Sequence, residues 1–374
     1  MWPKYEGKNA MKPNLIFPRG SALPAALALC LLTTMAAPTA TVVDIANLKG
    51  PERERMLVDG AKTESKVTIY SPMIEDQALR PITQAFHQKY PFIEAEFWRA
   101  DTRDLINKTL AEARARAVVG DVIEGGGVSQ ALIKAGALQA FTTPALAPYD
   151  KQRYDSNGFW AATRVSYFGL AYNTRLVKTE DAPKTYQDLL DPKWKGKLCW
   201  AATTETGGAM MFISFIRLFM GEVKGEAYLR DLSKQNVANM TGSPREVVNK
   251  VMQGECAIAI DIFLHHPIIS AQKGAPVAAR PLEPVLSNAS VVTLAKGATH
   301  PHAAMLLIDY LLSKEAQQVL EKADYLPAHP DVRPQSSLEN IVPSMAHLQE
   351  RFMSEEYLFD NRAKSLDLQK KYFQ

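Results

Sequence analysis

Apolar residues in the first third of the chain alternate between short extended runs and longer runs with helical spacing. The segment 66–70 (KVTIY) predicts a strand, and 77–90 predicts a helix whose apolar residues recur on one face. The pattern continues with a predicted strand at 94–98, a helix at 104–118 and a third strand at 120–124. Strands that alternate with helices in this way build a mainly parallel sheet flanked by helices.

The same alternation returns in the second half of the chain. An apolar extended run at 165–172 ends in a Pro-punctuated loop, after which a new strand is predicted at 196–201. The pattern then predicts helices at 208–220, 224–233 and 243–253, a strand at 256–260, an extended segment at 290–294, a helix at 302–312 and an amphipathic helix at 345–352. These elements form a second α/β unit.

Residues 1–40 are typical of an upstream extension followed by a secretory signal peptide. Lys12 and Arg19 form a positive flank, an apolar run covers 22–32, and small residues follow at 34–37. The apolar run is too short to span the roughly 30 Å of bilayer hydrocarbon, so we expect cleavage and export rather than anchoring.

The charge balance argues against a nucleic-acid ligand. The whole chain carries a formal net charge of +3, and 1–40 contributes four basic residues against one acidic residue. The exported part is therefore close to neutral. It has no basic stripe and no run of Lys and Arg interleaved with aromatic residues, which nucleic-acid-binding proteins show.

Cys199 and Cys256 are the cysteines that remain beyond the signal peptide. Both fall at the start of predicted strands of the second unit, and an oxidising compartment would allow them to pair. The sequence is equally compatible with a disulfide and with two buried free thiols.

Candidate ligand-binding residues follow from the ends of the predicted strands. Ligands of open parallel sheets bind beyond the carboxyl ends of the strands, where loops lead into helix N-termini. In the first unit these residues are Ser71, Pro72, Arg99, Asp101, Glu124, Gly125 and Gly126, with Tyr167 in the extended run, and in the second unit they are Thr203, Thr204, Thr206, Gly207, Asp261, Phe263 and His265.

The segment 203–208 (TTETGG) combines hydroxyls and glycines just before a long apolar helix. Unpaired N–H groups at such a terminus favour an anionic guest, although capping by Thr204 or Thr206 is the structural alternative. One helix terminus contributes about 0.3–2 kcal/mol toward a charge, whereas micromolar binding requires about 8 kcal/mol. Contacts from both units are therefore needed, and Arg103 and the amides of 125–127 are further candidates.

The segment 183–197 reads PKTYQDLLDPKWKGK. It resembles the entry to the second lobe in bacterial periplasmic solute-binding proteins of ABC importers, in the branch that contains ferric-ion-binding proteins. The segment SKEAQQ at 313–318 resembles the return to the first lobe in this family. Tyr325, within DYLPAHPDV, resembles the turn that closes the family's cleft, and it joins the candidate ligand-binding residues.

The resemblance implies a type II periplasmic binding protein fold, with two lobes joined by a two-stranded hinge and each lobe a mainly parallel sheet flanked by helices. It places the N-terminal lobe at 61–165 with 288–330, and the C-terminal lobe at 173–285 with 335–374. The implied protein is periplasmic, captures a small solute between the lobes and delivers it to an inner-membrane ABC permease. We expect it to be a monomer without cofactor or metal, and the helix-terminus argument favours an anionic organic solute.

The chain departs from the ferric-binding pattern at 254–268 (GECAIAIDIFLHHPI). Ferric binders of this family typically carry adjacent tyrosines where Leu264 and His265 stand here. Fe(III) prefers anionic oxygen ligands, and His265 and His266, as neighbours in extended backbone, would face opposite ways. Ferric iron or a ferric chelate is therefore the alternative ligand rather than the leading one.

Two other function classes fit the sequence less well. An enzyme on the same fold is conceivable because fold does not fix function, but the chain has no G-x-S-x-G elbow, H-E-x-x-H motif or Walker loop. A transcription regulator would lack an export signal and carry a DNA-binding helix pair. We therefore expect a carrier and not an enzyme.

Overall fold

The structure of the protein is a computed structural model that describes residues 40–203 and 206–374. The predicted upstream extension and signal peptide, up to residue 39, lie outside the described residues, and so does Thr204. The described strands form one hydrogen-bonded series in the order β2-β1-β3-β9-β5-β8-β6-β7, with β4, β10 and β11 attached at its sides.

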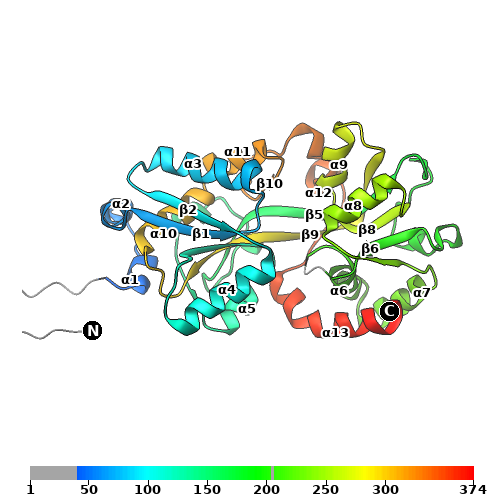
Figure 1. Cartoon of the computed structure of the whole chain (residues 1–374), viewed down its shortest axis with the longest axis horizontal. Coiled ribbons are helices and arrows are strands. Elements are labelled where there is room, and N and C mark those ends of the chain that lie inside the picture. Colours follow the sequence, from blue (N-terminus) through cyan, green and yellow to red (C-terminus); the bar gives the residue numbers. More distant parts are fainter. Residues whose placement is uncertain (1–39, 204–205) are drawn as a thin grey trace, which may run out of the picture. The chain divides into compact units, whose positions relative to one another are not determined.

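The first group of strands confirms the alternation predicted for the first third of the chain. Strand β1 pairs in parallel with both β2 and β3. In Figure 1, α3 and α11 lie above these strands and α4 and α5 below them. The group consists of β1 (Lys66–Ser71), β2 (Glu94–Arg99), β3 (Val122–Gly125) and β4 (Leu138–Gln139), with α1 (Val42–Ala46), α2 (Arg53–Glu64), α3 (Arg80–Lys89), α4 (Thr102–Ala115), α5 (Ser129–Lys134), α10 (Pro301–Leu311) and α11 (Lys314–Lys322).

The second group of strands is built in the same way. Strand β6 pairs in parallel with β7 and β8. In Figure 1, α8 and α9 lie above these strands, and α6, α7 and α13 lie below them. The group consists of β6 (Leu198–Ala201), β7 (Ala238–Met240) and β8 (Ile258–Phe263), with α6 (Ala209–Met220), α7 (Glu222–Ser233), α8 (Pro244–Gln253), α9 (His265–Gln272) and α13 (Glu355–Phe373).

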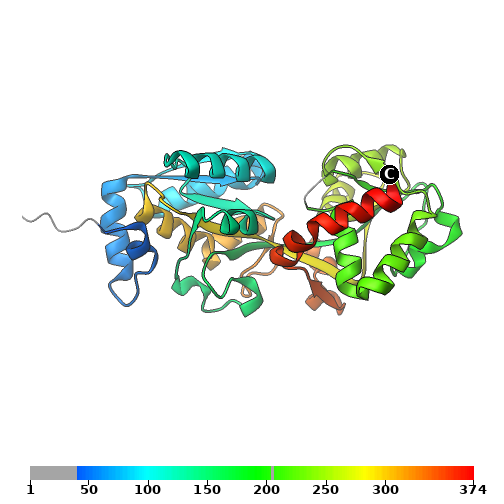
Figure 2. The same cartoon turned by 90° about the horizontal axis from the view of Figure 1, so that it is seen from below.

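Two long antiparallel strands, paired with each other, join the first group to the second. Strand β9 (Val277–Ala295) pairs with β3 near its end and with β5 (Ala161–Asn173) along most of its length, while β5 also pairs with β8. Figure 2 shows β9 continuing from one group into the other. The predicted segment 290–294 is only the last part of this strand. The sequence missed the rest because Pro281 and Pro284 signal a break, and the register with β5 does jump there.

The tail differs from its prediction. The amphipathic helix expected at 345–352 is wrong: α12 (Pro343–Ala346) ends early, and β11 (Glu350–Phe352) pairs in parallel with β9. Backbone pairing with a distant strand overrode the helical spacing of a short segment. The short strand β10 (Leu326–Pro327) pairs with β5. As expected for docking on the second unit, α13 packs against α6 and α7.

The buried apolar side chains gather around the two groups of strands. Around the first group, Ile69, Phe86 and Tyr310 belong to one cluster, to which the missed helices α1 and α2 contribute Ile45 and Leu57. Around the second group, the cluster includes Trp200, Phe212, Phe215 and Leu229, and a smaller cluster includes both cysteines with Val247 and Val251. Among the described helices, none combines the length and the apolarity needed to cross a membrane.

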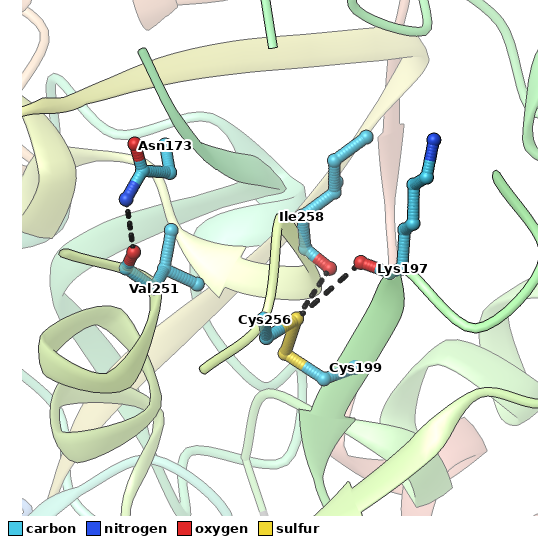
Figure 3. Close-up of a disulfide and its surroundings, with 6 residues drawn as sticks. All are labelled: Asn173, Lys197, Cys199, Val251, Cys256 and Ile258. Carbon is cyan, nitrogen blue, oxygen red and sulfur yellow. Dashed lines mark hydrogen bonds between the residues drawn. A yellow bond between two sulfur atoms is a disulfide. The ribbon is translucent and has the colours of Figure 1, made fainter. Parts of the chain in front are cut away.

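A disulfide joins Cys199 in β6 to Cys256, two residues before β8 (Figure 3). The two parallel strands are neighbours, so these residues near their starts lie within bonding reach, with the Cα atoms 6.2 Å apart. Nearby, the Asn173 side chain donates from Nδ2 to the carbonyl oxygen of Val251 at 2.7 Å, which ties the end of β5 to α8. Of the two alternatives that the sequence left open, the structure has the disulfide.

Candidate functional site

The end of β1 and the end of β3 meet at a buried carboxylate. Glu124 accepts hydrogen bonds from the Ser71 hydroxyl at 2.6 Å and from the Thr163 hydroxyl at 2.8 Å, and it forms an ion pair with Arg164 at 3.2 Å. The carboxylate is fully buried and Arg164 nearly so, with side-chain exposures of 0% and 11%. Because these neighbours already satisfy Glu124, its role here is to hold Arg164 in place.

Arg164 faces an aromatic ring from the loop before β10. Its guanidinium carbon lies 4.9 Å from the ring centre of Tyr325, which is cation–π geometry. The Tyr325 hydroxyl in turn accepts a hydrogen bond from the Ile74 amide at 3.3 Å. The Tyr325 ring is 6.4 Å from that of His265 at the start of α9, so this tyrosine connects residues of the first and second groups.

Phe263, His265 and His266 form an aromatic cluster at the end of β8. The two imidazole ring centres are 4.4 Å apart, and the Phe263 ring lies 5.8 Å from that of His265 and 5.2 Å from that of His266. The expectation of an extended backbone here is wrong, because both histidines belong to the first turn of α9. Both Nδ1 atoms are buried and lack a hydrogen-bond partner within the described part of the chain.

Burial and positive neighbours keep both imidazoles neutral. Burial, with smaller contributions from the positive charges of Arg164 and Arg245, lowers the pKa of His265 to about 3. Burial also lowers the pKa of His266 well below its ordinary value, with smaller contributions from His265 and Arg245. Two neutral ring nitrogens beside two cations can accept or donate hydrogen bonds to a ligand without adding charge.

Arg245, the second cation, comes from the first turn of α8. It donates to the carbonyl oxygen of His266 at 3.1 Å and to the Ser270 hydroxyl at 2.8 Å. Among residues 40–203 and 206–374, no carboxylate forms an ion pair with this guanidinium. Arg164 and Arg245 therefore place positive charge on either side of the histidine pair.

The loop before α6 approaches the first group of strands. Gly207 and Gly208 both have positive φ, and a Cβ on Gly208 would lie 2.3 Å from the carbonyl oxygen of Ala201, so only glycine fits there. A Cβ built on Gly126 would be 3.7 Å from the methyl carbon of Thr206, which brings this loop close to the glycines that follow β3. The first-group and second-group parts of the candidate site thus adjoin each other.

Several predicted site residues are placed in other roles. The Asp261 carboxylate is buried and accepts from the Gly208 amide at 2.9 Å, which ties the loop before α6 to β8. Tyr167 lies on the face of β5 opposite Arg164 and lines a cavity of about 270 Å³ with Arg153 and His329. Arg99, Asp101 and Thr203 are exposed, and Asp101 caps α4. The Pro72 ring packs against Gly125, which itself pairs with β9.

The candidate site thus has a core of residues that are linked by a chain of neighbouring contacts. Its members are Ser71, Glu124, Gly126, Arg164, Thr206, Gly207, Arg245, Phe263, His265, His266 and Tyr325. Prediction from sequence missed Arg164, Arg245 and His266. A charged residue inside an apolar strand was a usable signal for Arg164, because an Arg is seldom buried without a partner. Arg245, in a helix start, gave no comparable signal.

No metal centre is evident from these positions. In the part of the chain that the structure describes, no group of three or more His, Cys, Asp or Glu residues is arranged to hold a metal ion. His265 and His266 offer nitrogen ligands only, whereas a hard ferric ion favours anionic oxygen.

The chain resembles solved binding proteins in fold. The iron-bound protein HitA of Pseudomonas aeruginosa superimposes with a TM-score of 0.69, over 83% of this chain and 99% of that chain, at 20% identity. The protein AfuA of Actinobacillus pleuropneumoniae, solved with fructose-6-phosphate, superimposes with a TM-score of 0.68, over 82% of this chain and 98% of that chain, at 22% identity. AfuA is a periplasmic binding protein, and the likeness of both structures to this chain confirms the α/β architecture predicted from the sequence.

Sequence comparisons agree with the fold. A periplasmic protein of Salmonella typhimurium, strain LT2, whose provisional name gives 2-aminoethylphosphonate as its ligand, is 30% identical over 188 residues, which are 48% of this chain and 55% of that protein. The chain thus spans about half the length of the curated relatives that it matches. The family model of the bacterial extracellular solute-binding proteins matches residues 121–347, well over half of the chain. The chain belongs to the bacterial extracellular solute-binding protein family.

Proposed function

We propose that this protein is the periplasmic substrate-binding component of an ABC importer. It captures a small organic anion between two lobes and delivers it to an inner-membrane permease. The observation that carries this proposal is the pair of cations, Arg164 and Arg245, on either side of the neutral imidazoles of His265 and His266. Arginine pairs with a carboxylate, phosphate or phosphonate through two parallel hydrogen bonds, which favours an anionic ligand.

Closure of the two lobes completes the proposal. We take the lobes at the boundaries expected from the sequence, with α1 and α2 added to the N-terminal lobe because both contact α10. Strands β5 and β9 serve as the hinge, because β9 pairs with β3 of the first group, β5 pairs with β8 of the second group, and the two strands pair with each other. The ligand is bound when the loop at Thr206 approaches Gly126 and is released when the two parts separate. The protein acts as an exported monomer and performs no chemical step on its ligand.

We infer that the ligand carries a phosphonate or phosphate group. The name of the Salmonella typhimurium relative specifies an aminoethylphosphonate, and AfuA was solved with a sugar phosphate. Both ligands present an anionic phosphorus group of the kind that two arginines recognise. A ferric chelate is the alternative ligand.

A ligand panel tests this function directly. The purified protein without its first 40 residues is mixed with 2-aminoethylphosphonate, fructose-6-phosphate, ferric citrate or maltose, and unfolding is followed by differential scanning fluorimetry. A ligand at one hundred times its Kd adds about 2.7 kcal/mol of stability, which raises Tm by roughly 5 °C. We expect the organic anions to raise Tm. A rise with maltose alone, a rise with ferric citrate alone, or conversion of a bound anion into product would each contradict the proposal.

Substitution of Arg245 locates the binding site. R245A removes one charge-assisted contact of about 1.5–3 kcal/mol, so we expect the Kd of the responding anion to rise about 10- to 100-fold in isothermal titration. R333A is the matched control, since Arg333 is an exposed arginine that pairs with Glu339 and is not part of the candidate site. Equal Kd values for R245A and the wild type would remove the arginine pair from the argument.

A further inference from the structure

Helix α13 belongs to the second group through most of its length. Its Ser365 hydroxyl lies 2.7 Å from the Ser214 hydroxyl of α6 and accepts from Arg217 at 3.1 Å, all of them buried. Farther out, Lys364 forms an ion pair with Glu222 of α7 at 2.7 Å. These contacts fix the body of α13 to α6 and α7.

The first residue of α13 instead contacts the first group. The Glu355 carboxylate accepts hydrogen bonds from the amides of Gly127 and Ser129 and from the Ser129 hydroxyl, with the Ser129 amide at 3.0 Å. Glu355 is 8% exposed and Ser129 is fully buried. The positive φ of Gly127 sets the turn that presents these donors to one carboxylate. The amides of 125–127, expected to bind a ligand, are therefore partly engaged by the protein's own carboxylate.

The contact between α13 and α5 is narrow. Beside Glu355 it is extended by Lys134 of α5, which pairs with the exposed Asp360 at 2.7 Å and lies 4.3 Å from the ring centre of Phe359. A groove of about 420 Å³ borders the contact, lined by side chains of α4, α5, α6 and α13, so the helices are not closely packed around it. Glu355 and Lys134 both bond across this contact, and of these two Glu355 is the buried one.

We propose that Glu355 is a clasp that positions the glycine loop 125–127 of the candidate site and favours the closed arrangement of the protein. The loop follows β3, and its Gly126 faces Thr206 across the site. Because the body of α13 moves with the second group, separation of the two groups has to break the bonds of Glu355 or carry the loop away. This proposal rests on the proposed function, since it assumes that the two groups separate and close.

The test compares E355Q with E356Q. Glu356 is the exposed neighbour in the same helical turn, so E356Q makes the same carboxyl-to-amide change without touching the clasp. Hydrogen–deuterium exchange is measured over residues 125–134 of the ligand-free protein, and the radius of gyration is measured by solution scattering. We expect E355Q to exchange faster in this segment and to have a larger radius, while E356Q matches the wild type. S129A removes the hydroxyl donor from the other side and should shift exchange in the same direction.

Affinity provides the second readout. For 2-aminoethylphosphonate as the probe, we expect E355Q to weaken binding about tenfold, mainly through faster dissociation, because a lost bias toward the closed state lowers apparent affinity. The clasp would be overturned if the exchange rate and the radius of gyration of both E355Q and S129A matched the wild type. It would also be overturned if E356Q changed them as much as E355Q does. If the wild-type protein binds no anion at all, the proposed function fails, while exchange and scattering still decide on the clasp.

Discussion

Arg164 and Tyr325 lie 161 positions apart in the sequence, yet the guanidinium carbon of Arg164 is 4.9 Å from the ring centre of Tyr325. The other side of the guanidinium is paired with Glu124. This arginine is thus fixed between a carboxylate and an aromatic face, with few rotamers left to it. A ligand that pairs with such a side chain does not have to order it first, which reduces the entropy cost of binding.

Removal of the Tyr325 ring should weaken anion binding. A partly desolvated cation–π contact contributes about 1–2 kcal/mol, so Y325A should raise the Kd for the anion that binds the wild type by about 5- to 30-fold. Y325F keeps the ring and loses only the hydroxyl contact with the Ile74 amide, so it should bind much more tightly than Y325A. Isothermal titration of both variants checks this, and equal losses in the two would show that the ring does not matter.

Gly208 should tolerate no side chain. It adopts φ 96° and ψ −159°, and an added Cβ would lie 2.3 Å from a backbone oxygen, so G208A should lower the free energy of unfolding by more than about 3 kcal/mol. Gly221 shares this backbone region, with φ 79° and ψ 165°, but has open space around the added atom. G221A therefore isolates the backbone cost and should lose less. Urea unfolding of the two variants would contradict this account if their losses matched.

Loss of the disulfide should lower stability substantially. Cys199 and Cys256 are 57 positions apart, and closing a loop of that size in the unfolded chain corresponds to about 4 kcal/mol in the chain-entropy description. C256S and the reduced wild type should therefore unfold at similarly lower urea concentrations than the oxidised protein. A reduced protein with the stability of the oxidised one would argue against this bond in solution.

The pH dependence of stability should carry a contribution from Glu355. Burial, with a smaller contribution from Glu124, outweighs the bonds from Ser129 and Gly127 and raises the pKa of this carboxyl from an ordinary value near 4.5 to about 7. The folded protein therefore holds a proton that the unfolded chain releases between these two values. This stabilisation is complete below pH 4.5 and is lost as pH rises through 7, by up to about 3 kcal/mol.

E355Q isolates that contribution from the other titrating groups. The other charged groups near Glu355 are Glu124, from β3, and Arg103 and Arg362, which line the same groove from α4 and α13. The buried histidines lower the stability of the fold as pH falls, which is the opposite of the effect of Glu355. The wild type minus E355Q difference in unfolding free energy should therefore decrease from pH 4.5 to pH 7.5. A difference that is flat, or that increases over this range, would show that Glu355 titrates near its ordinary value.

Strand ends were the most informative feature of the sequence. Ser71, Glu124, Thr206, Phe263 and Tyr325 were all expected at one site, and they do lie together because parallel strands bring their carboxyl ends to one edge. What the sequence could not supply was the direction of individual side chains.

The misplaced and missed residues share that cause. Tyr167 was expected at the site but lies on the other face of β5, where the register of a long strand decides which side chains point inward. Glu355 was missed because its partners lie 226 and 228 positions away, a pairing that only the docking of α13 creates. His265 was assigned the wrong backbone, since a transition from strand to helix over the single residue Leu264 leaves little periodicity to read.

The path of β9 has a consequence for how the chain folds. The sheet of the first group reaches its full width only when residues 277–295 arrive, and α10 and α11 are synthesised later still. A growing chain consequently has a long stretch of synthesis in which neither half has all of its partners. This delay fits the export proposed for the protein, because a polypeptide that has not completed its core is easier to thread through a translocation channel.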